Sequence, residues 1–559
     1  MKHSLSRAAR RAGAVLAAVA VSAGLVACAA QEEGAGHTPA DGTWDSITYL
    51  EPQTFNTLYP PAAGFYPNGV IVNQITDRLL YQDPETLELS PWIATELPEV
   101  NADATEYTFT IRTDVTYSDG SPLTAQNVVN NIDLYGLGDK SRTLTSSEQI
   151  TNYERGEVLS PDTVRFHFSA PAPGFAQAVS SYNAGLLSDA TIAKNNQGFA
   201  PGAATEISGS GPFTIVEEEL GTSLVLQARE DYAWAPPARE HQGPARLDEI
   251  RLVVAQEQSV RIGGLVAGQA DIARQIDAPE EKHLENAGYE VLAAPTNGMN
   301  NQLMFRFRNP KVSDIRVRQA IIHGIDREEI LYTLFSDSYV MATSSMARKG
   351  QGYKEQPAEA YAYDPERSKK LLDEAGWVPG PDGIRVKDGL RLSLNVNEAL
   401  PQPRSREVIT KIQEHLRRIG VEITLNPGDN ATQNADSLDF EKIPLRHSMV
   451  ARADYDVIKS LYHSDNRNDL LNGFDGTVAD QHLDDLLQGI ASSPDEKRRA
   501  ELSGQVQDYL TQQAYVLPLF EEPIVYGIAP YLKGFGPETV GRPSFYEPGL
   551  TMTSRRHSK

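Results

Sequence analysis

The stretch that decides the fold is residues 105–129, which read TEYTFTIRTDVTYSDGSPLTAQNVV. Apolar and polar side chains alternate over residues 106–112, and this period of two predicts a half-buried strand. Asp119 and Gly120 predict a tight turn, because both residue types favour turn conformations. Thr124 is a suitable N-cap for a helix that follows. The segment therefore predicts a strand, a turn and a helix in succession.

The amino-acid sequence of this segment also resembles the signature of family 5 of the extracytoplasmic solute-binding proteins, which serve peptide and nickel ABC importers. Further matches follow in the family's order: residues 75–81 (ITDRLLY), 89–95 (LSPWIAT), 209–213 (GSGPF), 265–272 (LVAGQADI), 314–328 and 363–377. Each match alone is weak, but their order over about 300 residues makes the resemblance specific. Most of these motifs contain turn and packing residues, so we interpret them as structural.

Other segments of the chain also alternate between strand and helix patterns, which predicts an α/β protein. The expected strands are residues 47–50, 106–112, 163–168, 223–227, 249–254, 390–396 and 421–425. The expected helices are residues 259–267, 315–335, 365–375, 404–419 and 494–513. About 530 residues after a signal peptide exceed one ordinary core, so two or three cores are expected.

The resemblance implies a two-lobed periplasmic-binding-protein type II fold with an extra peripheral subdomain in the first lobe. On this basis lobe I covers residues 46–298 and includes the subdomain at 86–206. Lobe II covers 299–517, and residues 518–559 return to lobe I and form the C-terminal tail. Two hinge strands join the lobes, and the ligand is enclosed between them.

The N-terminus predicts export and lipid attachment. Basic residues precede an apolar run over residues 12–27, which is typical of a secretory signal peptide (1–27). The run ends in Leu-Val-Ala-Cys28, which resembles the bacterial lipobox, and Cys28 is the only cysteine of the chain. Lipidation of Cys28 would anchor the protein to the outer face of the cytoplasmic membrane. Residues 28–45 are rich in Ala, Gly and Glu and predict a flexible tether.

Composition and missing motifs exclude several function classes. The chain has 51 basic and 75 acidic residues, and four of the basic residues lie in the signal peptide, so 47 minus 75 leaves −28. This charge argues against nucleic acid as a partner. A Walker P-loop, a His-Glu-x-x-His motif, a Cys-x-x-Cys motif and a Gly-x-Ser-x-Gly elbow are all absent. We therefore expect no catalytic residues, no cofactor and no bound metal.

The resemblance places a peptide-binding aspartate downstream, after a strand of the second lobe. Residues 454–465 read DYDVIKSLYHSD, and in this layout Asp465 falls at the position that binds the peptide's ammonium group. Tyr462 falls at the aromatic position and Lys459 at the carboxylate-binding one. The alternatives are that Asp465 caps a turn and that Lys459 is a solvated or structurally paired strand residue.

Two other segments are candidates for ligand contact. Tyr59, Phe65 and Tyr66 lie in a Pro/Gly-rich loop, in the region that lines the cleft in relatives; packing of that loop is the alternative. Asn300 and Asn301 lie in the expected hinge and can offer amide hydrogen bonds to a ligand.

The sequence thus predicts a monomeric lipoprotein that captures short peptides and delivers them to the permease and ATPase of an ABC importer. A nickel chelate, an oligosaccharide or another polar solute is the alternative cargo for the same fold. A surface enzyme or receptor that reuses the fold is the alternative from another class, and the absence of catalytic motifs argues against it.

Overall fold

The computed structural model describes residues 45–399, 402–428, 430–466 and 477–550. The predicted signal peptide, Cys28 and nearly all of the tether lie outside these residues, as do residues 551–559. In the described part of the chain, no helix is both long and apolar enough to cross a membrane.

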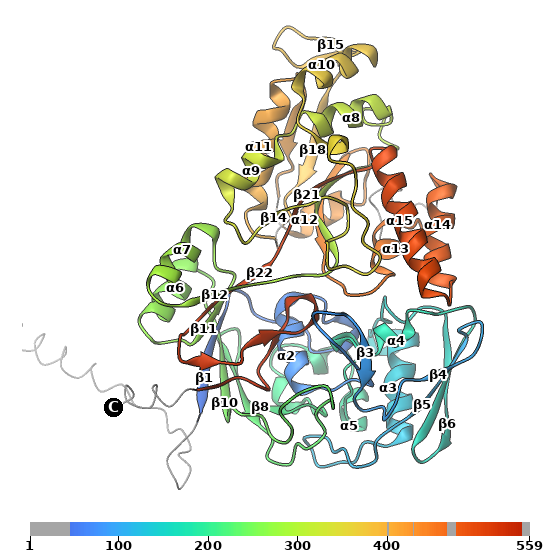
Figure 1. The fold of residues 1–559 in the computed structure, drawn as a ribbon, viewed down its shortest axis with the longest axis vertical. Helices are drawn as coiled ribbons and strands as arrows, with labels where there is room; N and C mark the ends of the chain where they lie inside the picture. The colour runs from blue at the N-terminus through green and yellow to red at the C-terminus, as the bar shows by residue number, and fades with distance from the viewer. Residues whose placement is uncertain (1–44, 400–401, 429, 467–476, 551–559) are drawn as a thin grey trace, which may run out of the picture. The chain divides into compact units, whose positions relative to one another are not determined.

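The first large unit is built on a seven-stranded sheet with the order β12-β22-β11-β1-β10-β9-β8 (Figure 1). Its strands are β1 Ser46–Glu51, β8 Phe213–Glu219, β9 Ser223–Ala228, β10 Glu249–Val254, β11 Ile272–Arg274, β12 Glu290–Ala294 and β22 Ile524–Ile528. Strand β1 pairs in parallel with β10 and β11. Helices α2 Tyr66–Ile75, α6 Gln258–Val266 and α7 Ala278–Asn286 belong to the same unit, which we call lobe I.

The opening stretch forms part of a smaller four-stranded sheet of lobe I, with the order β4-β5-β7-β6. The strands are β4 Glu99–Val100, β5 Glu106–Thr110, β6 Tyr153–Ser160 and β7 Thr163–Phe168, and the short helices nearby in the chain are α4 Phe175–Ala178 and α5 Asp189–Ile192. Gly120 has a φ of 81°, as the tight turn requires. The Thr124 side chain accepts a hydrogen bond from the backbone of Asn127 and caps α3 Ala125–Leu137. The predicted strand, turn and helix are confirmed.

The second large unit, lobe II, has a six-stranded sheet with the order β14-β21-β13-β20-β18-β19. Its strands are β13 Met299–Phe305, β14 Val340–Met341, β18 Ser393–Asn397, β19 Glu422–Leu425, β20 Leu445–Val450 and β21 Val516–Glu521. Its helices are α8 Ile315–His323, α9 Arg327–Leu334, α10 Pro365–Glu374, α11 Ser405–Arg417, α12 Asn430–Asp436, α13 Val457–Tyr462, α14 Gln481–Ser492 and α15 Glu496–Gln512.

Short strand pairs complete the described fold. They are β2 Leu80–Gln82 with β3 Leu89–Pro91, β23 Leu532–Lys533 with β26 Gly549–Leu550, and β24 Gly536–Pro537 with β25 Pro543–Ser544. A three-stranded sheet joins β15 Val378–Pro379, β16 Arg385–Lys387 and β17 Leu390–Arg391.

The single helix predicted over residues 315–335 is wrong, because the chain forms two helices there. Helix α8 ends at His323, and the side chain of Asp326 accepts a hydrogen bond from the backbone of Glu329 at 2.9 Å. This bond satisfies an otherwise unpaired N–H at the start of α9. A local cap therefore overrides the continuous apolar pattern. The strand predicted over 390–396 is likewise divided between β17 and β18.

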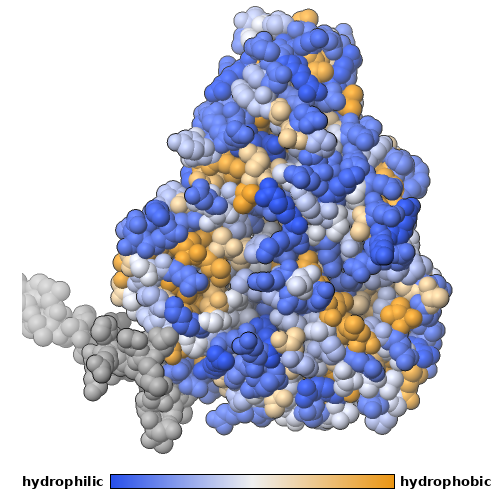
Figure 2. All heavy atoms as spheres, viewed as in Figure 1, coloured by the Kyte–Doolittle hydropathy of each residue, from blue (hydrophilic) through white to orange (hydrophobic). Residues whose placement is uncertain are grey.

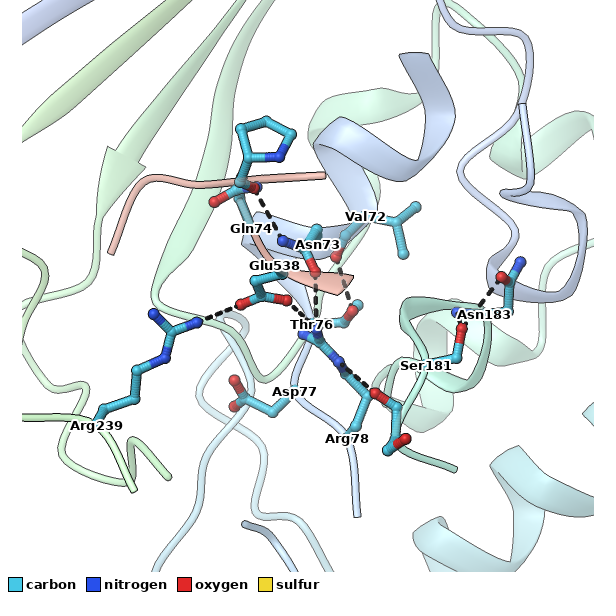
Figure 3. Close-up of polar contacts among 12 residues, drawn as sticks. Val72, Asn73, Gln74, Thr76, Asp77, Arg78, Ser181, Asn183, Arg239 and Glu538 are labelled. Carbon is cyan, nitrogen blue, oxygen red and sulfur yellow. Dashed lines mark hydrogen bonds and ion pairs between the residues drawn. The ribbon is translucent and has the colours of Figure 1, made fainter. Parts of the chain in front are cut away.

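The C-terminal segment is attached to lobe I by a buried carboxylate, Glu538 (Figure 3). Arg78 Nη2 and Arg239 Nη2 donate to its two oxygens at 2.5 and 2.7 Å. Asn73 Oδ1 also accepts a hydrogen bond from Arg78, at 2.8 Å. Burial by itself raises the pKa of Glu538, but the two arginines outweigh it and the pKa lies below its ordinary value.

The face of the molecule shown in Figure 2 is covered mainly by hydrophilic residues, with hydrophobic residues in small groups. Large exposed apolar side chains include Tyr332, Leu220 and Leu137. Apolar residues scattered in this way are ordinary on a protein surface.

The chain crosses between the two large sheets at two places. The first crossing lies between β12 and β13, and the second between β21 and β22. Thr296 Oγ1 in the first crossing donates to the backbone oxygen of Glu522 in the second at 3.0 Å. The two crossings are thus joined directly.

Gly298 in the first crossing lies too close to its neighbours to accept a side chain. A Cβ atom there would be 2.1 Å from Val450 O and 2.6 Å from Arg452 N, both backbone atoms. We expect Gly298→Ala to lower the free energy of unfolding by about 1 to 3 kcal/mol, the usual cost of overpacking. Denaturant unfolding measures this change.

The matched control is Gly263→Ala in helix α6, where nothing lies within 4 Å of the added Cβ. This control should be neutral or stabilising by about 0.5 to 1 kcal/mol, because alanine favours the helix. Equal stabilities of the two variants would show that the crossing tolerates a side chain.

Candidate ligand-binding site

A cavity of ≈ 630 Å³ lies where the two crossings meet the loops of both lobes. This volume falls in the range of small-molecule and cofactor sites, about 300 to 1,000 Å³. Its lining comes from Gln53, Pro61, Ala62, Gly64, Phe65, Tyr66, Thr145, Ser146, Ser147, Glu148, Gln149, Tyr182, Asn183, Arg274, Thr296, Gln402, Met449, Val450, Ala451, Arg452, Glu522, Ile524 and Arg542. Residues far apart in the sequence therefore share one chamber.

Two of the three predicted loop aromatics, Phe65 and Tyr66, line the cavity. Pro67 near the start of α2 favours the helical turn that places them. Two guanidinium groups lie over the Tyr66 ring. The guanidinium carbon of Arg274 is 3.9 Å from the ring centre and that of Arg542 is 4.1 Å from it. Such contacts stabilise both the ring and the cations. Burial raises the pKa of Tyr66 to about 12, so its hydroxyl stays protonated.

The third aromatic, Tyr59, lies in the core of lobe I and is only 1% exposed. Its ring packs against Tyr135 and Phe199, with ring centres 6.0 and 5.2 Å away. Its hydroxyl donates to the backbone oxygen of Thr145, a cavity-lining residue, at 3.1 Å. Tyr59 therefore supports the cavity wall and is not among the residues that line it.

Arg274 enters the cavity wall as half of a buried ion pair. Its Nε donates to both carboxylate oxygens of Glu51 at 3.0 Å, and its Nη2 also contacts this carboxylate. The two side chains are 6% and 7% exposed. Tyr49 donates a further hydrogen bond to Glu51 at 3.0 Å. This pairing satisfies Glu51 and fixes the guanidinium beside Tyr66.

A second buried pair, Arg452 with Asp454, lies just after strand β20. Nε and Nη2 of Arg452 donate to the two carboxylate oxygens of Asp454, both at 2.9 Å. Arg452 lines the cavity, and its buried Nη1 has no hydrogen-bond partner among the residues that the structure describes. Both side chains are about nine-tenths buried. Arginine favours such bidentate pairing with a carboxylate.

The predicted layout of residues 454–465 is corrected in one respect. The strand of this region is β20, and residues 457–462 form helix α13, so Lys459 lies on a helix. Its burial is intermediate, whereas Asp465 is exposed and lies beyond the helix. Tyr462 is fully buried, and its hydroxyl donates to Gln302 Oε1 at 2.9 Å. These three residues are absent from the described cavity lining, and their roles stay a prediction.

The predicted hinge amides are both buried and have different partners. Asn300 Nδ2 donates to the backbone oxygens of Ser344 and Met346, both at 2.9 Å. Asn301 Nδ2 donates to Glu522 Oε2 at 2.9 Å. Asn301 therefore contacts a cavity residue, while Asn300 holds a neighbouring loop.

Glu522 is a buried carboxyl in the cavity wall at the second crossing. Its side chain is 6% exposed, and burial raises its pKa from 4.5 to about 8, although the hydrogen bond from Asn301 opposes the shift. The Oδ1 atom of Asn301 lies 2.6 Å from Nε2 of His447, on the side away from Glu522. Nδ1 of His447 in turn lies 2.9 Å from the hydroxyl of Ser405. Burial lowers the pKa of His447 to about 4, so this imidazole is neutral.

Sequence reasoning missed Arg274, Arg452, Asp454, Glu522 and Arg542 as residues of this region. One usable signal was present: Arg452 and Asp454 directly follow the alternating strand β20. The other residues carry no local signal, since tertiary contacts bring them to the cavity. Among the described residues, no group of three or more His, Cys, Asp or Glu side chains has the geometry to hold a metal ion.

Curated relatives match along most of this chain. It is 25% identical over 564 residues to Protein XP55 of Streptomyces lividans, a match that covers 96% of this chain and 95% of the relative. It is 23% identical over 498 residues to the glutathione-binding protein GsiB of Escherichia coli K12, covering 86% of this chain and 90% of the relative.

Solved structures share the fold at lower sequence identity. NikA from Brucella suis in complex with Fe(III)-EDTA superposes with a TM-score of 0.77 at 22% identity, covering 90% of this chain and all of that one. The oligopeptide-binding protein AppA from Bacillus subtilis, in complex with a nonapeptide, superposes with a TM-score of 0.73 at 18% identity. The match covers 91% of this chain and 99% of that one. The expected two-lobed type II binding-protein fold is confirmed.

The family model described as bacterial extracellular solute-binding proteins, family 5, matches residues 88–469, which is more than half of the chain. Members of this family are substrate-binding proteins of ABC importers, not enzymes. The chain therefore belongs to family 5 of the bacterial extracellular solute-binding proteins.

Proposed function

We propose that this protein captures short peptides in the cavity between its lobes and delivers them to the permease of an ABC importer. The observation that carries the proposal is the charge pattern of the cavity, which holds guanidinium groups and a buried carboxyl in one chamber. A peptide has a terminal carboxylate and a terminal ammonium group, and both need partners when they leave water. Extended backbone between them can form hydrogen bonds that do not depend on sequence.

The cation best suited to a ligand carboxylate is Arg542. In the described part of the chain it forms no ion pair, and its Nη2 donates only to the backbone oxygen of Gly64, at 3.0 Å. Arg274 and Arg452, by contrast, are already neutralised by Glu51 and Asp454. A ligand bound to both lobes would favour the closed form, which the permease receives.

Mass spectrometry of the ligand that co-purifies with the protein tests the proposal, together with calorimetry using mixed di- to pentapeptides. We expect peptide masses and measurable heat. No heat, with peptide uptake intact after deletion of the gene, would overturn the proposal. An Asp465→Asn variant should bind as the wild type does, because Asp465 lies outside the described cavity lining; weaker binding would instead support its predicted role.

A metal chelate is the second candidate cargo. Arg542 beside Tyr66 also suits a carboxylate of a chelating ligand, and NikA of Brucella suis is known in complex with Fe(III)-EDTA. Bound metal in the co-purified material would favour this cargo over peptides.

We also propose that Cys28 attaches the protein to the outer face of the cytoplasmic membrane through a lipid. The lipobox-like sequence before Cys28 supports this, and two acyl chains suffice for stable anchoring. A Cys28→Ala variant should move from the membrane fraction to the soluble exported fraction and lose incorporation of labelled palmitate. An unlabelled wild-type protein that remains at the membrane would contradict the proposal.

A further inference from the structure

The carboxyl group of Glu522 has a position that its contacts within the chain do not explain. It lines the cavity at the second crossing, beside Thr296 and Gln402. Its Oε2 accepts one hydrogen bond, from Asn301 at 2.9 Å. Among the described residues, no Lys, Arg or His forms an ion pair with it. A buried carboxyl with a single amide donor is costly when it is charged.

Two other buried carboxylates are each paired with an arginine of the cavity wall. Glu51 is paired with Arg274, and Asp454 with Arg452. The groups that face Glu522 are neutral or distant: Asn301 from β13, Tyr339 beside β14, and His447 from β20 behind Asn301. The guanidinium groups of the cavity wall lie outside ion-pair distance of it.

We propose that Glu522 binds the terminal ammonium group of the peptide and releases its proton as the ligand enters. This inference rests on the proposed function, because it assigns one end of the peptide to one residue. The amino terminus is the one cation that every peptide carries, so a site that accepts many sequences must recognise it. An ammonium group at Glu522 supplies the missing charge partner, while Asn301 continues to hold Oε2.

The proton balance is simple. Free Glu522 is largely protonated at pH 7, since its pKa lies at about 8. The bound ammonium group favours the carboxylate, so the carboxyl O–H bond breaks and the proton passes to the buffer. A purely structural Glu522, held by Asn301 as a neutral hydrogen-bonding group, would release no proton.

The test is calorimetry at pH 7 with mixed di- to pentapeptides, and with the same mixture after N-acetylation. Phosphate and Tris differ in ionisation enthalpy. The difference between the binding enthalpies measured in the two buffers therefore gives the number of protons released on binding. We expect the wild type to release a proton on binding and to lose affinity about 30-fold or more on N-acetylation. Glu522→Gln should lose affinity by a similar factor for free peptides and release no proton.

The variants separate this inference from the proposed function. Glu522→Gln keeps the volume and the acceptor for Asn301, so it should remain folded, as circular dichroism can verify. Glu521→Gln is the matched control: the neighbouring carboxyl is paired with Arg348 and does not line the cavity. If the wild type binds no peptide, the proposed function fails. If it binds free and acetylated peptides alike and Glu522→Gln matches it, only the role of Glu522 fails.

Discussion

A Glu538→Gln variant should lose about 3 to 5 kcal/mol of unfolding free energy, the usual cost of breaking a buried ion pair from one side. The amide cannot neutralise Arg78 and Arg239, which both donate to Glu538 and are 4% and 13% exposed (Figure 3). Among the described residues, Arg78 would then stay buried without a counter-charge, and Arg239 would keep only Glu547, at 2.9 Å. Urea unfolding followed by tryptophan fluorescence measures the loss, since Trp92 and Trp234 lie in the core of lobe I.

The matched control for this variant is Glu366→Gln. Glu366 pairs with Lys369 at 2.7 Å, but its side chain is 80% exposed. Exposed pairs contribute about 0 to 1 kcal/mol, so this variant should unfold nearly as the wild type does. If Glu538→Gln were as stable as the control, the attachment of the C-terminal segment would not depend on this carboxylate.

The stability of the wild type relative to Glu522→Gln should fall as the pH rises from 5 to 9. The folded pKa of Glu522, about 8, lies above its ordinary value of 4.5. Its stabilising contribution is therefore fully present below pH 4.5 and is lost as the pH rises through 8. Because each pKa unit corresponds to about 1.4 kcal/mol, the difference is on the order of 4 kcal/mol at pH 9.

Urea unfolding of both proteins at several pH values measures this difference. They should have similar stability at pH 5, where both side chains are neutral, and the variant should be the more stable protein at pH 9. Asp77, whose pKa burial raises to about 7, adds a pH dependence of its own, but both proteins share it and it cancels. A difference that does not change with pH would mean that Glu522 is not buried in solution as it is here.

Much of the local structure could be predicted because it depends on neighbours in the chain. The alternation over residues 106–112 and the cap at Thr124 need no distant partner, and both are confirmed. The break between α8 and α9 is also local, because the side chain of Asp326 caps α9, but the apolar pattern over residues 315–335 predicts one continuous helix.

The positions of the candidate site residues depend more on tertiary contacts. Phe65 and Tyr66 were found because aromatics in a Pro/Gly-rich loop are a visible signal, and both line the cavity. The prediction of Asp465 depended on the alignment of a short pattern. Helix α13 holds Lys459, where a strand residue was the alternative, and the role of Asp465 stays a prediction.

The sequence by itself determined the family and the strand and helix patterns, because motifs and periodic patterns depend only on residues that are close together in the chain. Only the tertiary structure decided which charged groups meet in the cavity. Glu51 and Arg274 are 223 positions apart, and Asn301 and Glu522 are 221 apart. The physical reason is that burial sets the charge state of Glu522, and burial exists only after both crossings and the loops of both lobes have come together.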